Sequence, residues 1–335
     1  MAERVVVMLG APFEVMGRET RVGASVGIDL SRSAVTPSEL LRNADVAMYV
    51  AKARGKGGYQ RFRPEMHAAV SGRLESEADL RRAVEAEEFR LYYQPILRLE
   101  DRAVIGFEAL LRWLHPDRGV VTPDDFIPLA EETGLIVPLG RWALREACRQ
   151  WRTWREQGCS PELKVTINVS ARHFQDVSLV EDVSAAMAES RVSPSALVLE
   201  ITESMLMHQT EVVREKLSEL KGLGVLLAVD DFGTGYSSLG YLHRFPIDVL
   251  KIDKTFVEQK GQGTGLSVIA RAIIGLAEAL HLQAVAEGIE QEAEAAALVA
   301  LGCLFGQGYL FARPSPPDDL GPFLARAISA ARSGA

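Results

Sequence analysis

Residues 226–239 read LLAVDDFGTGYSSL, an apolar run followed by two neighbouring acids and a glycine-rich turn. Four apolar residues precede Asp230 and Asp231, so the segment predicts a buried strand that ends in carboxylates. Gly233 and Gly235 permit the positive φ angles of a tight turn. Adjacent carboxylates repel each other, so their place at the end of a buried strand indicates that the charge has a use.

The same pattern repeats along the chain from about residue 72, where short apolar strands alternate with amphipathic helices. Roughly eight such strand–helix units predict an α/β fold, a TIM-like (β/α)8 barrel. A doubly wound open sheet is the structural alternative, but no GxGxxG motif follows an early strand. The predicted strands are FRLYYQPI, AVIGFEALL, LKVTINVS, LVLEITE, VLLAVDD, VLKID, QAVAEGI and CLFGQGYLF, and the helices between them include RWALREACRQWRTWREQG, TEVVREKLSELKGLG and GLSVIARAIIGLAEALH.

Composition limits the class of protein. The 335 residues are 47% hydrophobic and 24% charged, which is typical of a globular protein with a sizeable core. The net charge of −8 argues against a general DNA-binding or anionic-membrane-binding protein. Three cysteines without paired spacing do not predict a disulfide framework. Because neither a membrane-spanning run nor a convincing signal peptide occurs, we expect a cytoplasmic location.

Polar residues follow nearly every predicted strand of the repeating part. In a parallel barrel the carboxyl ends of the strands meet at one rim, where active sites lie. Clustered carboxylates with one lysine need further positive charge, and carboxylate and amide oxygens suit Mg²⁺ or Mn²⁺. The six histidines show no metal-ligand spacing, which disfavours a zinc enzyme. The strand-end residues are Glu108, Asn168, Glu200, Glu203, Asp230, Asp231, Lys251, Asp253, Glu287, Glu290 and Gln307.

The first part of the chain, residues 1–66, has a different pattern. VVVML and RVGASVGIDL predict short strands, residues 38–55 predict a helix, and YQRF predicts a last strand. This composition indicates a small α+β unit with few chemical groups. The charged amphipathic stretch 71–88 predicts a helix that is either a solvated leading helix or a connector that passes a signal onward.

An ordered set of motifs in residues 72–330 resembles EAL domains, the bacterial phosphodiesterases of cyclic di-GMP. The set is EALLRW, FIPLAEETG, INVS, LEITES, DDFGTGYSSL, LKIDKTFV, AEGIE and QGYLF. The resemblance implies a TIM-like barrel with one antiparallel strand. It also implies that cyclic di-GMP is hydrolysed to the linear dinucleotide pGpG by a water activated at a centre of two Mg²⁺ or Mn²⁺ ions.

The resemblance also assigns residue roles. It implies Glu108, Asn168, Glu200 and Asp230 as ligands of the first metal, and Asp231 and Glu287 as ligands of the second, with Asp230 shared. The catalytic group is then Lys251, which contacts the attacking water, together with Glu287 and Asp231. Glu203 anchors the DDFGTGYSSL loop. The implied substrate-binding residues are Gln94, Glu108, Leu111, Arg112, Asp253 and Gln307. For Arg112, a salt bridge at the barrel rim is the alternative interpretation.

The first unit resembles the C-terminal portion of a GGDEF (diguanylate cyclase) domain through SVGIDL and LLRNADVAMYVAKARGKGGYQRF, but the GGDEF signature does not occur. The predicted organisation is a GGDEF-like fragment without catalytic motif at 1–66, a linker and leading helix at 67–88, and the EAL barrel at 89–330. A homodimer is expected from the resemblance alone.

Two further interpretations stay open beside the phosphodiesterase. A non-catalytic cyclic di-GMP receptor would share the fold, but such modules lose metal-binding acids or the DDFGTGYSSL loop, and this sequence keeps both. An enolase-like barrel with a lysine base and magnesium explains the acids and Lys251 but not the whole motif set.

Overall fold

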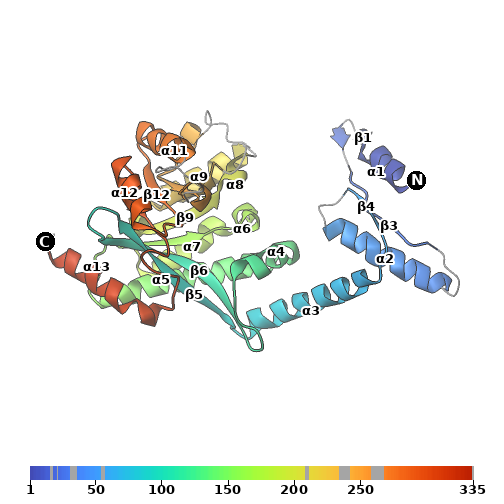
Figure 1. Cartoon of the computed structure of the whole chain (residues 1–335), viewed down its shortest axis with the longest axis horizontal. Helices are drawn as coiled ribbons and strands as arrows, with labels where there is room; N and C mark the ends of the chain where they lie inside the picture. The colour runs from blue at the N-terminus through green and yellow to red at the C-terminus, as the bar shows by residue number, and fades with distance from the viewer. Residues whose placement is uncertain are drawn as a thin grey trace. The chain divides into compact units, whose positions relative to one another are not determined.

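A computed structural model describes residues 1–15, 18–20, 22–30, 36–53, 57–207, 211–233, 242–257 and 268–333. The chain divides into two compact units, Met1–Arg82 and Ala83–Ala335 (Figure 1). No helix in the described ranges is both long and apolar enough to cross a membrane.

The first unit is built around one helix packed on a two-stranded parallel sheet. Helix α2 lies against β3 and β4 so closely that a Cβ at Gly27 would come within 1.8 Å of the Ala44 carbonyl oxygen. Only glycine permits this approach of helix to strand. A second strand pair, β1 with β2, is antiparallel. The elements are α1 Ala2–Gly10, β1 Phe13–Val15, β2 Arg18–Thr20, β3 Val26–Ile28, α2 Pro37–Ala53 and β4 Tyr59–Arg61, and α3 Glu65–Glu85 crosses into the second unit.

The predicted strand at VVVML is wrong, because these residues lie in helix α1. Valine favours strands where a pleated surface buries it, but none of the residues of α1 is buried. Without burial of these side chains, the flanking helix formers and Glu3 in the first turn favour a helix instead. The helix predicted for residues 38–55 and the strand predicted at YQRF are present as α2 and β4.

The second unit is a closed barrel. Eight strands of its described residues form a ring in the order β5-β13-β12-β11-β10-β9-β8-β6, and pairing of β5 with β6 closes it. β5 runs antiparallel to both neighbours, whereas the other neighbouring pairs are parallel, so the expected single antiparallel strand is confirmed. The closure excludes the open-sheet alternative. The strands are β5 Phe89–Arg98, β6 Val104–His115, β8 Lys164–Asn168, β9 Leu197–Thr202, β10 Leu226–Phe232, β11 Val249–Ile252, β12 Gln283–Ala286 and β13 Phe305–Gly306, with β7 Gly119–Val121 paired to the outer part of β6.

Helices cover the outside of the barrel, and α5 shows why they pack there (Figure 1). Its buried residues Leu144, Ala147, Cys148 and Trp151 repeat at the spacing of one helix face. The helices of this unit are α4 Pro123–Thr133, α5 Ile136–Glu156, α6 Ala171–Gln175, α7 Leu179–Ser190, α8 Glu203–Met207, α9 Glu211–Gly222, α10 Lys254–Val257, α11 Val268–Ala279, α12 Glu292–Ala300 and α13 Gly321–Ser333.

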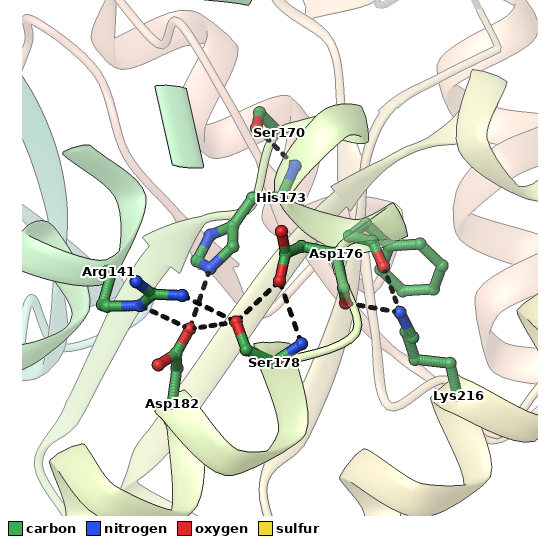
Figure 2. Close-up of polar contacts among 8 residues, drawn as sticks. Arg141, Ser170, His173, Asp176, Ser178, Asp182 and Lys216 are labelled. Atoms are coloured by element: carbon green, nitrogen blue, oxygen red, sulfur yellow. Dashed lines mark hydrogen bonds and ion pairs between the residues drawn. The ribbon is translucent and has the colours of Figure 1, made fainter. Parts of the chain in front are cut away.

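A polar cluster around α6 fixes the segment that follows β8 (Figure 2). Asp182 of α7 accepts hydrogen bonds from Arg141 Nε at 2.8 Å and from Ser178 Oγ at 2.9 Å. Lys216 of α9 donates to the carbonyl oxygens of Phe174 and Asp176 at 2.8 and 2.7 Å. The cluster therefore joins α5, α6, α7 and α9 just beyond Asn168, the last residue of β8.

His173 lies within this cluster, where its side chain is 3% exposed. Its Nε2 atom is 3.7 Å from Asp182 Oδ2, too far for a hydrogen bond, and burial lowers the pKa of the imidazole despite Asp182. Because the folded pKa is below the unfolded value, the unfolded chain binds more protons, and stability is lost as pH falls below about 6.5.

We expect the His173→Gln variant to lose less stability than the wild type when pH falls from about 7 to about 5.5, because it has no imidazole to charge on unfolding. Thermal melts at a series of pH values measure the difference. His281→Asn, at an exposed histidine of the same unit, is the control and should keep the wild-type profile. Identical dependence of the melting temperature on pH in His173→Gln and in the wild type would contradict the lowered pKa of His173.

Candidate functional site

Lys251 of β11 lies at the centre of a ring of acids inside the barrel. Its Nζ atom lies near four carboxylates, although its side chain is only 2% exposed. Burial alone would lower the pKa of this ammonium, but the surrounding carboxylates outweigh burial and raise it well above its ordinary value. The distances from Nζ are 2.5 Å to Glu287 Oε1, 2.8 Å to Glu200 Oε1, 3.4 Å to Glu108 Oε2 and 3.6 Å to Asp230 Oδ1.

Glu108 is held by two amide side chains as well as by Lys251. Asn168 Nδ2 donates to Glu108 Oε1 at 2.8 Å, and Gln307 Nε2 donates to Glu108 Oε2 at 2.5 Å. Burial raises the pKa of Glu108, but Lys251 and these two donors outweigh burial, so the net direction is downward. Gln307 also donates to Glu287 Oε1 at 3.1 Å and so links Glu108 with Glu287.

Glu108 was predicted at the end of its strand, but the strand continues beyond it. β6 continues to His115, because the hairpin with β5 and the pairing with β7 supply further backbone partners. Glu108 therefore lies in the middle of β6 and faces Gln94 of β5 in register. Glu200 likewise lies inside β9, in register with Asn168.

Glu200 and Glu287 are the two carboxyls of the ring whose ionised form is disfavoured. Burial raises the pKa of Glu200 well above its ordinary value, and the neighbouring Glu108 adds to the shift. Burial also raises the pKa of Glu287 to about 8, even though Lys251 opposes it. The ring therefore has more negative charge than one ammonium neutralises.

The two adjacent acids of β10 occupy different positions. The pairing of β10 with β11 shifts register between Val229 and Phe232, and Asp231 has a φ of 55°. This irregularity is a bulge of the kind that redirects side chains beside active sites. Asp230 Oδ1 accepts the Asp231 N–H at 3.0 Å, while Asp231 is exposed at the rim. Although Asp231 is exposed, partial desolvation of its carboxyl and the charge of Asp230 raise its pKa.

Glu203 begins helix α8 and is buried. Its Oε2 atom accepts the Gly233 N–H at 2.9 Å, directly after the two acids. Residues 234–239 of the DDFGTGYSSL segment, including Gly235 and the serines, lie outside the described residues. The anchoring role is therefore seen only at Gly233.

The predicted substrate-binding residues outside the ring engage local partners. Gln94 Nε2 donates to the Ala312 carbonyl at 3.0 Å, and Asp253 Oδ1 accepts the Thr255 N–H at 2.9 Å. Arg112 Nη1 donates to the carbonyl of the half-buried Leu111 at 2.8 Å.

Tyr92 was not predicted from the sequence as a site residue. The Arg112 guanidinium lies 5.7 Å from the Tyr92 ring centre. The alternation of side chains along a strand could have indicated Tyr92, because Tyr92 and the predicted site residue Gln94 share one face of β5.

The ring is chemically suited to divalent cations. The five carboxylates predicted as metal ligands and one ammonium leave four negative charges when all are ionised, which two divalent ions would balance. Within the part of the chain that the structure describes, Glu200 Oε2 and Gln307 Oε1 are buried oxygens without a hydrogen-bond partner. Among the described residues, no group of three His, Cys, Asp or Glu is already arranged to hold a metal ion, since the carboxylates lie against Lys251 instead. Glu108, Asn168, Glu200, Asp230, Asp231 and Glu287 are the residues that would hold Mg²⁺ or Mn²⁺.

The raised pKa of Glu287 predicts an unusual pH dependence without metal. A folded pKa of about 8, above the ordinary 4.5, means that the folded chain binds more protons. The stability that Glu287 contributes is complete below about pH 4.5 and is lost as pH rises through about 8. We expect the melting temperature in EDTA to fall between about pH 6 and 9, and to fall less in Mg²⁺, which favours the ionised carboxylates. If the melting temperature falls with pH equally in EDTA and in Mg²⁺, the ring does not bind Mg²⁺ through the ionised Glu287.

The geometry defines a class of protein, a closed (β/α)8-type barrel with one antiparallel strand and a ring of acids around a buried lysine. Comparison with known families then identifies it more closely. The EAL domain family matches residues 77–314, and the chain belongs to this family.

Known relatives share both sequence and structure with the chain. It is 42% identical over 321 residues to a bifunctional diguanylate cyclase/cyclic di-GMP phosphodiesterase, MucR, of Pseudomonas aeruginosa, covering 96% of this chain and 47% of that protein. It is 40% identical over 317 residues to a cyclic di-GMP phosphodiesterase, PdeR, of Escherichia coli, covering 94% and 48%. The chain thus spans about half the length of these curated relatives.

A solved structure described as the PaMucR phosphodiesterase in complex with c-di-GMP matches with a TM-score of 0.70 and 43% identity. That match covers 73% of this chain and 99% of the solved one.

Proposed function

We propose that the barrel hydrolyses cyclic di-GMP to pGpG at a centre of two Mg²⁺ or Mn²⁺ ions. The observation that supports this most directly is the ring of carboxylates around Lys251, in a chain similar to a phosphodiesterase solved with c-di-GMP. The ring combines surplus negative charge with oxygen ligands, which is the chemistry of a divalent-metal phosphodiesterase. A receptor without activity would not need this charge surplus.

The metal ions, when bound, supply a water of lowered pKa and positive charge for the phosphate oxygens. This chain contributes the remaining groups. Glu108 and Glu287 are held beside each other by Gln307 Nε2, which donates to both carboxylates. Lys251, held by Glu200 and Glu287, is the cation we assign to orient the attacking water. Arg112 lies near the ring and is suited to pair with a phosphate.

The bond changes follow from the product. The oxygen of the attacking water forms a bond to one phosphorus of the cyclic dinucleotide, and the bond from that phosphorus to the 3′ oxygen breaks. The attacking water loses one proton as its oxygen bonds to phosphorus, and the 3′ oxygen gains one proton and leaves as a hydroxyl, so the two transfers balance. The phosphate stays on the 5′ oxygen of the linear product. Glu108, Asn168, Glu200, Asp230, Asp231 and Glu287 would hold the two cations, which would stabilise the charge on the attacking and leaving oxygens.

The test is to incubate the protein with cyclic di-GMP and Mg²⁺ or Mn²⁺ and to follow pGpG by chromatography. We expect turnover in both ions and little in Ca²⁺, whose longer and more flexible coordination fits the ring less well. Tight binding of cyclic di-GMP without product would favour the non-catalytic receptor. Neither binding nor product would reject the cyclic di-GMP assignment as a whole.

The first unit and the oligomeric state are separate proposals. We infer that the N-terminal unit is a GGDEF-like portion without cyclase activity, supported by the match to the bifunctional MucR over 96% of the chain and by the lack of a GGDEF signature. Product analysis with GTP should show no cyclic di-GMP synthesis. The homodimer is proposed from the family resemblance, and light scattering of the full chain would test it.

A further inference from the structure

The contacts of Lys251 coincide with the oxygens that would hold a metal. Its Nζ atom is 2.5 Å from Glu287 and 2.8 Å from Glu200, and both side chains are among the proposed ligands. Glu108 and Asp230 lie slightly farther away, at 3.4 and 3.6 Å. The ammonium is therefore in contact with the acids on several sides.

An ammonium and a divalent ion cannot hold the same oxygens equally well. Mg²⁺ needs its oxygen ligands at about 2.0–2.1 Å in near-octahedral geometry. Repulsion between a divalent ion and an ammonium about 4 Å apart is large in a site with little water. Either the ammonium withdraws from Glu200 and Glu287 or the metal binds with reduced affinity.

We propose that Lys251 is an internal counter-cation that competes with divalent metal for Glu200 and Glu287, and so sets the metal concentration at which the site is loaded. The proposal rests on the proposed function, because it assumes that the ring binds metal. Lys251 stabilises the acid ring when metal is scarce, and the cost of displacing its contacts lowers the affinity for the metal. The same side chain then has two effects, on stability without metal and on metal loading.

The test uses Lys251→Met, which keeps most of the side-chain volume but removes the charge. We expect the variant to melt at a lower temperature than the wild type in EDTA, because the buried carboxylates lose their partner. We expect its dissociation constant for MgCl₂, measured by calorimetry, to be at least about tenfold lower. Its rise in melting temperature on addition of Mg²⁺ should therefore exceed that of the wild type.

Lys216→Met is the matched control. Lys216 Nζ also makes two close contacts, but both are with backbone carbonyls rather than with carboxylates (Figure 2). Its loss should lower stability while leaving the Mg²⁺ dissociation constant within about twofold of the wild type. Should Lys251→Met fail to fold even in Mg²⁺, Lys251→Gln, which can still donate to the acids, gives the same comparison.

The outcomes separate this proposal from the function. Wild-type binding of Mg²⁺ combined with equal or weaker binding by the neutral variants would overturn the role of Lys251 and leave the phosphodiesterase intact. Absence of Mg²⁺ and Mn²⁺ binding in all proteins would overturn the metal centre and this proposal together. Tighter binding by the neutral variants would support the proposal, whether or not those variants retain turnover.

Discussion

Asp231→Asn should reduce the turnover of cyclic di-GMP by about a hundredfold to a thousandfold and leave the fold intact. In the proposed mechanism Asp231 neutralises and positions a catalytic cation, and a single electrostatic group of this kind typically contributes on the order of 10²–10³ in rate. Asparagine keeps the size of the side chain and its ability to lie near metal. The rate change would therefore report the charge alone.

The backbone conformation at Asp231 is one that asparagine tolerates, so this substitution should disturb the fold less than a substitution at the other acids. Asp231 has a φ of 55°, a conformation that asparagine adopts readily. It is also exposed at the rim, so the substitution removes little buried surface. Single-turnover rates and thermal melts of the same preparation separate loss of chemistry from loss of structure.

Glu162→Gln is the matched control for charge. Glu162 is an exposed acid just before β8, at the end of the strands opposite to the ring, and its loss should leave the rate unchanged. Normal turnover in Asp231→Asn would contradict the second metal position. Loss of rate with a matching loss of stability would instead show that Asp231 has a structural role.

Trp154→Ala should give the largest loss of stability, about 3–5 kcal/mol. Trp154 is 1% exposed and packs against Tyr93 on β5 and Phe107 on β6. The centre of its ring lies 4.9 Å from that of Tyr93 and 4.7 Å from that of Phe107. Removing the indole leaves a cavity where α5 meets the barrel wall. Chemical denaturation of the full chain, followed by circular dichroism, measures the change in the free energy of unfolding.

Trp154→Phe distinguishes packing from polar effects. The Trp154 indole N–H is buried and has no hydrogen-bond partner among the described residues, so its removal takes away a desolvation cost. We expect the phenylalanine variant to lose well under half of what the alanine variant loses. A similar loss in both would mean that the indole nitrogen has a stabilising contact, contrary to the geometry described above.

The sequence alone determined the repeating strands and the chemistry at their ends. Apolar runs ending in acids predicted a barrel, and carboxylates gathered with one lysine predicted a cation-binding rim. Such statements depend on strand periodicity and residue type, which are local properties of the chain. The order of the motifs also identified the family resemblance.

The tertiary structure decided how these residues meet. Lys251 faces three acids that lie in different strands and Glu287, which directly follows β12, because closure brings the strands together. Gln307 donates to both Glu108 and Glu287. The bulge that separates Asp230 from Asp231 depends on pairing with β11. The helix at VVVML depends on the lack of burial at α1. These contacts join residues that are far apart in the sequence. The local pattern of apolar and polar residues does not specify how close such residues come in space.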